Sequence, residues 1–262
     1  MTEAATGSVL GYQVDNGVAW LRLNRPQRRN AIDEPLRRAL AEAVKKAERA
    51  PEVRALVVVG EGQAFCAGAD VREFQERTGA VEEIRGDYEF ILQRLHGMPK
   101  PTIAAVNGAA AGIGASIAFA CDLRFAVPEA SFVEAFVKIG LTVDGGATWL
   151  LPRLIGPGKA LEMFYTGEPL GAEEASRLGL VNRLVGREQL EPSVRELAER
   201  LASGPAAALG AIKRSVNFAT AASLEEAMEF EFGLQGVMME SEDFREGVSA
   251  FLEKRAPRFQ GR

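Results

Sequence analysis

The spacing of apolar residues predicts the first elements of the chain. Over residues 9–16 and 17–23 apolar and polar side chains alternate, and Asn16-Gly17 separates the two runs. Alternation with a period of two is typical of half-buried strands, and Asn-Gly favours the tight turn of a β-hairpin. Residues 34–50 instead carry apolar side chains at helical spacing, so we expect an amphipathic helix there.

Strand and helix patterns then alternate through the middle of the chain. Residues 53–60 and 102–106 are short continuous apolar runs, which predict buried strands. Further strands are expected at residues 123–127 and 131–137, and a helix around residues 148–154. This alternation predicts an α/β core.

The C-terminal third has a different pattern, since from Ala172 onward it is helical with few strand signals. Helices are predicted over residues 172–178, 188–202, 206–219, 223–240 and 242–254. We therefore expect a core of residues 1–200 and a C-terminal helical region of residues 201–262. The last helices have apolar faces that a lone monomer would expose, which predicts that they pack against neighbouring subunits.

Composition excludes several classes of protein. The 262 residues are 47% hydrophobic and 26% charged, as is usual for a globular protein. The net charge of −5 and the lack of a dense Lys/Arg block argue against nucleic-acid binding. No apolar run reaches the roughly 18 residues of a membrane span, and the first residues lack a signal peptide's pattern, so we expect a cytoplasmic protein without a membrane partner. Cys66 and Cys121 cannot form a metal site alone, so reduced thiols and no bound metal are expected.

Residues 101–122 are the stretch around which the chain is organised. An apolar, strand-like run leads through Asn107-Gly108 to Gly112 and Gly114, and a helix of small residues follows. Such a helix start lets the backbone approach a ligand closely and points free amide groups at it. The stretch therefore predicts a site that holds negative charge with backbone alone.

Several separated motifs make the chain similar to one known superfamily. They are Leu23-Asn-Arg-Pro, Ala64-Phe-Cys-Ala-Gly-Ala-Asp70, Ala104-Ala-Val-Asn-Gly108, Ala120-Cys-Asp122 and Arg245-Glu-Gly-Val-Ser-Ala-Phe-Leu-Glu-Lys-Arg255. In this order they resemble the crotonase, or enoyl-CoA hydratase/isomerase, superfamily across essentially the whole chain. The resemblance implies a spiral of ββα units, a C-terminal helical trimerisation region, and a homotrimer or a hexamer built as a dimer of trimers. It also implies an acyl-CoA substrate, which brings CoA with it, so no separate cofactor is expected.

The resemblance further implies an oxyanion hole at the two glycine-rich stretches. Reactions of the superfamily pass through a thioester enolate or oxyanion, whose oxygen needs preorganised donors. One donor is implied to be the backbone N–H of Ala69, and the other that of Ile113, between Gly112 and Gly114. The alternative is that both stretches are tight turns whose glycines serve packing alone.

The acid/base residues depart from the pattern of the superfamily's hydratases, which use two glutamates. When the sequences are aligned on Cys121-Asp122, Ser116 stands in the place of the first glutamate and Phe136 in the place of the second. Neither side chain shuttles a proton as a carboxylate does. A conventional hydratase is therefore not expected.

Asp144 is the carboxylate that we expect to replace them. It lies in an apolar loop just before a helix, and isomerases of the superfamily carry an acid at this position. Residues 144–153 resemble in particular the isomerases of the phenylacetate pathway, which turn a ring epoxide of phenylacetyl-CoA into an oxepin. An apolar surround would raise the pKa of Asp144, and one carboxylate can remove a proton from one carbon and return it to another. The alternative role is to cap the helix that follows.

Three functions remain open at this point. The first is an acyl-CoA isomerase with Asp144 as the acid/base. A hydratase or hydrolytic relative would need Asp144 to activate water with help from Glu134, and a dehalogenase-like enzyme would need a base from His96, the single histidine. The third is a non-catalytic acyl-CoA-binding protein.

The remaining candidates are side-chain and backbone groups around the same stretches. Glu134 shares strand parity with Phe136 and could line the pocket beside Ser116, but we expect a surface or salt-bridge role for it. Contacts with the CoA ester are implied for Arg28, Ala31, Ala67, Gly68, Asp70, Val71, Gly112, Gly114 and Lys254. Pocket shape is expected to depend on Phe74, Leu92, Trp149 and the C-terminal helices.

Overall fold

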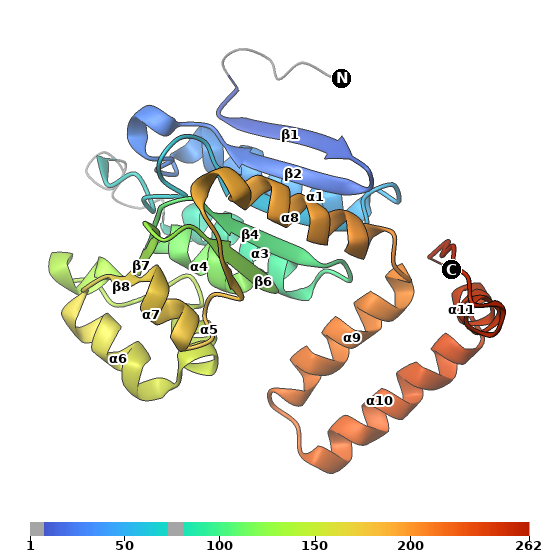
Figure 1. Ribbon diagram of the computed structural model, residues 1–262. Coiled ribbons are helices and arrows are strands. Elements are labelled where there is room, and N and C mark those ends of the chain that lie inside the picture. The colour runs from blue at the N-terminus through green and yellow to red at the C-terminus, as the bar shows by residue number, and fades with distance from the viewer. Residues whose placement is uncertain (1–7, 73–80, 262) are drawn as a thin grey trace.

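A six-stranded sheet forms the centre of the computed structural model, which describes residues 8–72 and 81–261 of the chain (Figure 1). Its strand order is β1-β2-β3-β4-β6-β9, and all neighbours are parallel except the antiparallel pair β1 and β2. The turn between β1 and β2 places Asn16 at φ 48° and Gly17 at φ 77°, so the predicted hairpin is confirmed. The strands are β1 (Leu10–Asp15), β2 (Val18–Leu23), β3 (Ala55–Gly60), β4 (Thr102–Val106), β6 (Leu123–Ala126) and β9 (Arg183–Leu184).

A second sheet of three short strands lies beside it in the described part of the chain. It consists of β5 (Ala109–Ala111), β7 (Ser131–Val133) and β8 (Leu170–Gly171). The chain alternates between the sheets, since β4 is followed by β5 and then by helix α4 (Ile113–Ala120), and β6 is followed by β7 and helical segments. This is the expected spiral of ββα units, and the α/β prediction is confirmed. β5, β8 and β9 were not predicted because two or three residues are too few to show a period.

Helices pack around both sheets. They are α1 (Glu34–Arg49), α3 (Val81–Gly97), α5 (Ala147–Ile155), α6 (Pro157–Thr166), α7 (Ala172–Arg177) and α8 (Arg187–Ala202), with 3₁₀ helices η1 (Pro26–Arg28) and η2 (Ala135–Ile139). The predicted amphipathic helix α1 begins where Asp33 accepts a hydrogen bond from the amide of Leu36, and its apolar face is buried. Helix α6 was missed because Pro157-Gly158 is typical of a turn, although proline is also compatible with a first helical position. Within residues 8–72 and 81–261, no helix is long and apolar enough to cross a membrane.

The predicted strand over residues 131–137 is too long. β7 ends at Val133, and the chain turns into η2, with Glu134 as its N-cap residue at φ −115°. Gly140 closes η2 at φ 73°. The segment after β7 is therefore a 3₁₀ helix rather than a strand, and the loop that carries Asp144 follows it.

Three C-terminal helices extend away from the sheets (Figure 1). They are α9 (Ala206–Ala219), α10 (Leu224–Met239) and α11 (Glu242–Glu253), within one or two residues of the predicted ranges. They line a common groove and leave large apolar side chains exposed, among them Phe232 at 68% and Phe251 at 83%. Helix α8 packs against the six-stranded sheet and the chain leaves the core after Ala202, while the boundary at residue 200 stays a prediction.

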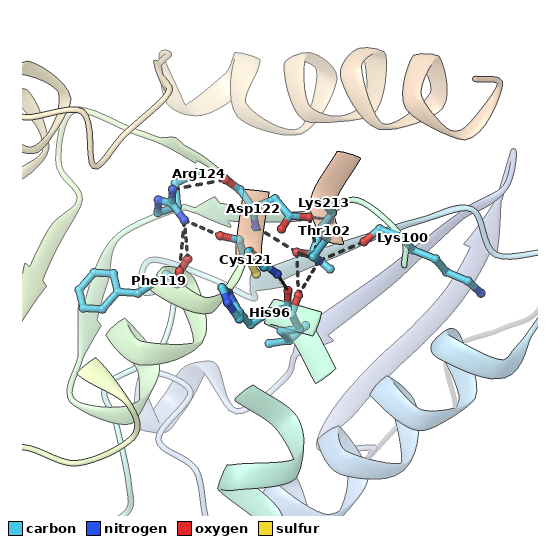
Figure 2. A network of polar contacts seen from close by, with 11 residues as sticks. His96, Lys100, Thr102, Phe119, Cys121, Asp122, Arg124 and Lys213 are labelled. Carbon is cyan, nitrogen blue, oxygen red and sulfur yellow. Dashed lines mark hydrogen bonds and ion pairs between the residues drawn. The ribbon is translucent and has the colours of Figure 1, made fainter. Parts of the chain in front are cut away.

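A polar network fastens α9 to the core (Figure 2). The Lys213 ammonium donates to the carbonyl of Leu95 at 2.8 Å and pairs with the Asp122 carboxylate at 2.9 Å. Asp122 also accepts a hydrogen bond from the amide of Thr102 at 2.8 Å. Because the Lys213 side chain is only 8% exposed, this network joins the first C-terminal helix to the ends of α3, β4 and α4.

Candidate active site

Two glycine-rich segments meet beside the second sheet. Cys66 pairs with Ala110 in a parallel bridge, and its carbonyl accepts a hydrogen bond from the Ala111 amide at 2.9 Å. Gly68 has φ 94°, and a Cβ atom there would lie 2.9 Å from the Ala111 carbonyl oxygen. A Cβ atom on Gly114 would lie 2.5 Å from the Cys66 carbonyl oxygen. Both glycines are therefore required for this close approach of two backbones.

The segments present the two amides that the sequence suggested as oxyanion donors. Ala69 follows Gly68, and Ile113 is the first residue of α4 after Gly112, whose φ is 49°. The amide of Gly112 donates to Val133, whereas among the described residues no acceptor receives the amide of Ala69 or Ile113. Free amides at a helix start favour a negatively charged oxygen, because the helix dipole adds to the hydrogen bonds. The role of these amides stays a prediction, but their placement suits it.

The other end of α4 is held by a buried cation. Arg124 is 3% exposed, and its guanidinium donates to the carbonyl of Cys121 at 2.5 Å (Figure 2). It also donates to the carbonyl of Leu180 at 2.6 Å. It also reaches the carbonyls of Ala118 and Phe119 at 3.3 and 3.4 Å. These acceptors include the last carbonyls of α4, which otherwise have no helical partner. Arg124 thus fixes the helix whose first amide faces the site, and sequence reasoning missed it because its partners are carbonyls.

The loop that precedes α5 closes over the first turn of α4. A Cβ atom on Gly145 would lie 2.8 Å from Ile113 Cδ1 and 2.9 Å from the Ser116 hydroxyl. Gly145 and Gly146 have φ values of 62° and 70°, which favour glycine at both positions. The loop therefore brings Gly145, the residue after Asp144, against the first turn of α4, and the role of Asp144 stays a prediction.

Asp144 itself is free to act on a ligand. It is exposed, and partial burial of the carboxyl group raises its pKa above the usual aspartate range. The capping alternative is wrong, because α5 begins after Gly146 without a side-chain cap, and Asp144 contributes only its backbone carbonyl to Ala147. The carboxylate is consequently available as an acid/base group.

Glu134 is the residue on which sequence reasoning failed. We expected a surface or salt-bridge role, but its side chain is 0% exposed and neither oxygen has a hydrogen-bond partner among the described residues. Burial, with a smaller contribution from the nearby charge of Asp144, raises the pKa of Glu134 to about 9. Strand parity correctly indicated that the side chain points inward, since Phe132, two residues before Glu134, is also fully buried. Strand parity could not reveal that no cation pairs with the Glu134 carboxyl among the described residues.

Ser116 and Phe136 stand close to the same helix start. Ser116 is fully buried on α4, and its hydroxyl has no partner within the described residues. The Phe136 ring lies 3.6 Å from where a Cβ atom of Gly112 would be. Both are at the site, and neither supplies a base.

The residues implied to contact CoA lie mostly on one loop and the strand-like segment paired with it. The Ala67 amide donates to the Arg29 carbonyl at 2.9 Å, and the Ile32 amide donates to the Gly68 carbonyl at 2.8 Å. Buried Asn30, at φ 57°, holds the two together by donating to the carbonyl of Ala64 at 2.8 Å. Arg28, Ala31, Ala67, Gly68, Asp70 and Val71 all fall on these paired segments.

Side chains on these segments divide by exposure. Arg28 is exposed on η1, and Val71 is 60% exposed. Asp70 is buried and pairs with Arg72 at 2.7 Å and Arg25 at 3.6 Å, and these cations, Arg72 first, lower its pKa to about 2. Asp70 therefore stabilises its loop, while Arg28 is available to a ligand.

Other candidates lie elsewhere. Lys254 caps α11, which Figure 1 shows at the far end of the molecule from α5 and α6. His96 ends α3 as expected, and its ring packs edge-on against Trp149 at 5.3 Å. Leu92 is buried in the core, and Phe74 lies outside the described residues. No group of three or more His, Cys, Asp or Glu side chains in the described part of the chain could hold a metal ion.

Comparison with known proteins gives consistent matches over nearly the whole chain. The sequence model of the enoyl-CoA hydratase/isomerase family matches residues 13–262. A Rhodobacter capsulatus protein named "probable enoyl-CoA hydratase" is 42% identical over 96% of this chain and 97% of the relative. The 1,2-epoxyphenylacetyl-CoA isomerase of Escherichia coli is 40% identical over 95% of this chain and 97% of the relative.

Solved structures agree with these sequence matches. An enoyl-CoA hydratase from Bacillus anthracis superposes with a TM-score of 0.91 at 30% identity, covering 97% of this chain and 100% of that one. An enoyl-CoA hydratase from Mycobacterium smegmatis superposes with a TM-score of 0.90 at 33% identity, covering 96% and 98%. The relatives thus carry hydratase and isomerase names alike.

Proposed function

This chain belongs to the enoyl-CoA hydratase/isomerase family, and we propose that it is an acyl-CoA isomerase in which Asp144 moves the proton. The observation that carries the proposal is the set of side chains at the start of α4. Ser116 and Phe136 occupy the places of the two hydratase glutamates that the resemblance implies, and neither can act as a base. Asp144 is the exposed carboxylate on the loop that packs against Ser116.

The mechanism begins with the removal of a proton. Asp144 takes it from the carbon next to the thioester, or from the vinylogous carbon, and the thioester oxygen becomes an enolate oxygen. The amides of Ala69 and Ile113 donate hydrogen bonds to that oxygen. Donors of this kind are worth roughly 2.7–4 kcal/mol each, because they stabilise charge that develops only in the transition state. Asp144 then returns the proton two carbons away, so the double bond moves and no water is added.

The raised pKa of Asp144 supports this role. A carboxylate with an ordinary pKa is a weak base, and a pKa nearer to neutrality makes proton removal from carbon less unfavourable. Partial burial provides such a shift here while leaving the group exposed to a ligand. The group is therefore a stronger base than an ordinary aspartate and remains open to a ligand.

The CoA part of the substrate fits the exposed loop around η1. Arg28 offers a cation to a phosphate group, and the amides of Ala69 and Ile113 are proposed to bind the thioester oxygen. We propose acyl-CoA as the substrate and a trimer or a dimer of trimers as the assembly, in which Lys254 could approach the CoA of a neighbouring subunit.

The experiment is a product analysis of purified enzyme with a 3-enoyl-CoA. We expect conversion to the 2-enoyl-CoA, followed by ultraviolet absorbance, with no gain of 18 mass units. Ser116→Ala, which removes only a hydroxyl, should lose far less activity than Asp144→Asn. Vigorous hydration of 2-enoyl-CoA by the wild-type enzyme would contradict the proposal.

One observation favours a second function, hydration of an enoyl-CoA. The neutral Glu134 carboxyl beside Asp144 provides a second acid, so Asp144 could activate water while Glu134 protonates the α-carbon. The name of the R. capsulatus relative agrees with this alternative. The same mass analysis separates the two functions, because hydration alone adds 18 mass units.

A further inference from the structure

Glu134 has an unusual environment for a glutamate. Its side chain is 0% exposed, and both carboxyl oxygens are without a hydrogen-bond partner in residues 8–72 and 81–261. A buried polar group without a partner destabilises the folded state, and a buried charge does so much more. Because such a group costs stability, a functional role is the explanation that we consider for Glu134.

Two cations on the neighbouring segments, Lys138 and Arg153, have partners of their own. On η2, Lys138 pairs with Glu168 at 2.8 Å. On α5, Arg153 stacks on the ring of Trp149 at 4.1 Å and donates to the Trp149 carbonyl. Asp144 is the charged group that acts on Glu134, and its negative charge opposes ionisation of Glu134. A buried carboxyl whose ionisation is opposed by a neighbouring carboxylate keeps its proton, as one member of carboxyl pairs in other active sites does.

The difference in burial decides which of the two carboxyls carries the proton. Glu134 is fully buried, whereas Asp144 is exposed on its loop. The more buried carboxyl keeps the proton, because the charged form loses more solvation there. Glu134 is then a neutral O–H donor, and the ionised Asp144 is the strongest acceptor near it.

Three glycines flank Asp144 in the segment from the end of η2 to the start of α5. Asp144 is followed by Gly145 and Gly146 and preceded by Gly140, all with positive φ values. No hydrogen bond joins the two carboxyls among the described residues. Catalytic hydrogen bonds are commonly long before substrate binds and shorten in the complex.

We propose that Glu134 is a positioning residue for the reaction, whose neutral carboxyl donates a hydrogen bond to the Asp144 carboxylate in the substrate complex. The hydrogen bond fixes one carboxylate oxygen, so the other oxygen faces the substrate carbon. Glu134 keeps its proton through the cycle, and Asp144 alone gains the substrate proton and returns it. This inference rests on the proposed isomerase function and adds a second residue to it.

The test compares two substitutions at one position. Glu134→Gln keeps a neutral donor of nearly the same shape, whereas Glu134→Met keeps the length and removes the donor. We expect kcat of Glu134→Gln within about threefold of wild type, and a loss of roughly tenfold or more in Glu134→Met. KM for the CoA ester should change little in either variant, because Glu134 acts through Asp144. Glu168→Gln, which alters an exposed ion pair, is the matched control.

A pH profile separates positioning from packing. A hydrogen bond to the ionised form lowers the pKa of Asp144, so its loss in Glu134→Met should move the acid limb of kcat/KM to higher pH. In Glu134→Gln, the acid limb of kcat/KM should stay at its wild-type pH. Thermal unfolding adds a folding control, since removal of an unpartnered buried carboxyl should leave Glu134→Met at least as stable as wild type.

Three outcomes would overturn the inference. Wild-type kcat and an unmoved acid limb in Glu134→Met would mean that Glu134 only fills space. An equal loss in Glu134→Gln and Glu134→Met would mean that Glu134 transfers a proton rather than holding one. If the wild-type enzyme isomerises no 3-enoyl-CoA, the proposed function fails, but the inference about Glu134 can still be tested. The Asp144 pKa is then measured by carboxyl NMR with a bound non-reactive CoA thioether, and an equal pKa in all three proteins contradicts the inference.

Discussion

The start of α4 and the C-terminal helices are built in opposite ways. All eight residues of α4 are buried, and their partners come from within the same chain. Helices α9 and α10, in contrast, each bury a single residue, Gly210 and Ala227, in the described chain. The start of α4 is therefore enclosed by its own chain, whereas the C-terminal helices have apolar faces that are exposed in the single chain. Chemistry and assembly should thus respond to different substitutions.

The largest effect is expected at the carboxylate of the site. Asp144→Asn should lower kcat by roughly 10²–10⁴-fold, because the amide cannot accept the substrate proton. Affinity for a CoA ester and the oligomeric state should stay close to wild type, since neither depends on this exposed loop residue. Steady-state kinetics and titration with a non-reactive CoA thioether measure both, and normal isomerisation by the variant would rule out Asp144 as the base.

A methyl group at Gly114, beside the Ile113 amide, should have the next largest effect. Gly114→Ala places a Cβ atom 2.5 Å from the Cys66 carbonyl oxygen and 2.7 Å from its sulfur, so the two segments must separate. Displacement of the Ile113 amide should lower kcat by roughly 10²–10³-fold, as loss of one oxyanion donor does. Gly158→Ala on α6 is the matched control, because a Cβ atom there meets nothing within 4 Å. Equal activity of the two variants would show that the donor lies elsewhere.

The pH dependence of kcat/KM tests the same carboxylate without a substitution. Asp144 is active as a base when ionised, so kcat/KM should fall about tenfold for each pH unit below its pKa. Because burial raises that pKa, the acid limb should lie above the usual aspartate range near 4. A rate profile between pH 4 and 8 measures it, and the limb should vanish from the residual activity of Asp144→Asn.

The C-terminal helices should determine assembly without changing the chemistry of the site. Wild-type protein is expected to elute as a trimer or hexamer of 28.2 kDa subunits, and a monodisperse monomer at micromolar concentration would contradict the assembly. Phe232→Asp puts a charge on a side chain that is 68% exposed in the single chain. It should weaken assembly while each chain stays folded, as light scattering and circular dichroism can establish.

The smallest effect is expected where the two regions meet. Lys213→Met removes a nearly buried cation that binds Asp122 and the Leu95 carbonyl. We expect a loss of about 1–3 kcal/mol, hence several degrees in melting temperature, with kcat within about twofold of wild type. Lys45→Met, at an exposed ion pair with Glu42, should shift the melting temperature much less.

The sequence predicted the elements whose pattern lies within one segment. The hairpin at Asn16-Gly17 and the range of α9 follow from local period and turn chemistry. The roles of Arg124 and Asn30 could not be predicted, because each binds carbonyls that any residue could provide. Glu134 shows a different limit, since parity places a side chain but does not reveal whether a cation accompanies it.

The fit of Gly145 against Ser116 limits how this scaffold can change its chemistry. A longer side chain at position 116 would meet the loop that carries Asp144, because even a Cβ atom on Gly145 lies 2.9 Å from the Ser116 hydroxyl. A glutamate at position 116 would therefore require the loop that carries Asp144 to move. An evolutionary route from one activity to the other would have to change the loop conformation together with the acid on α4.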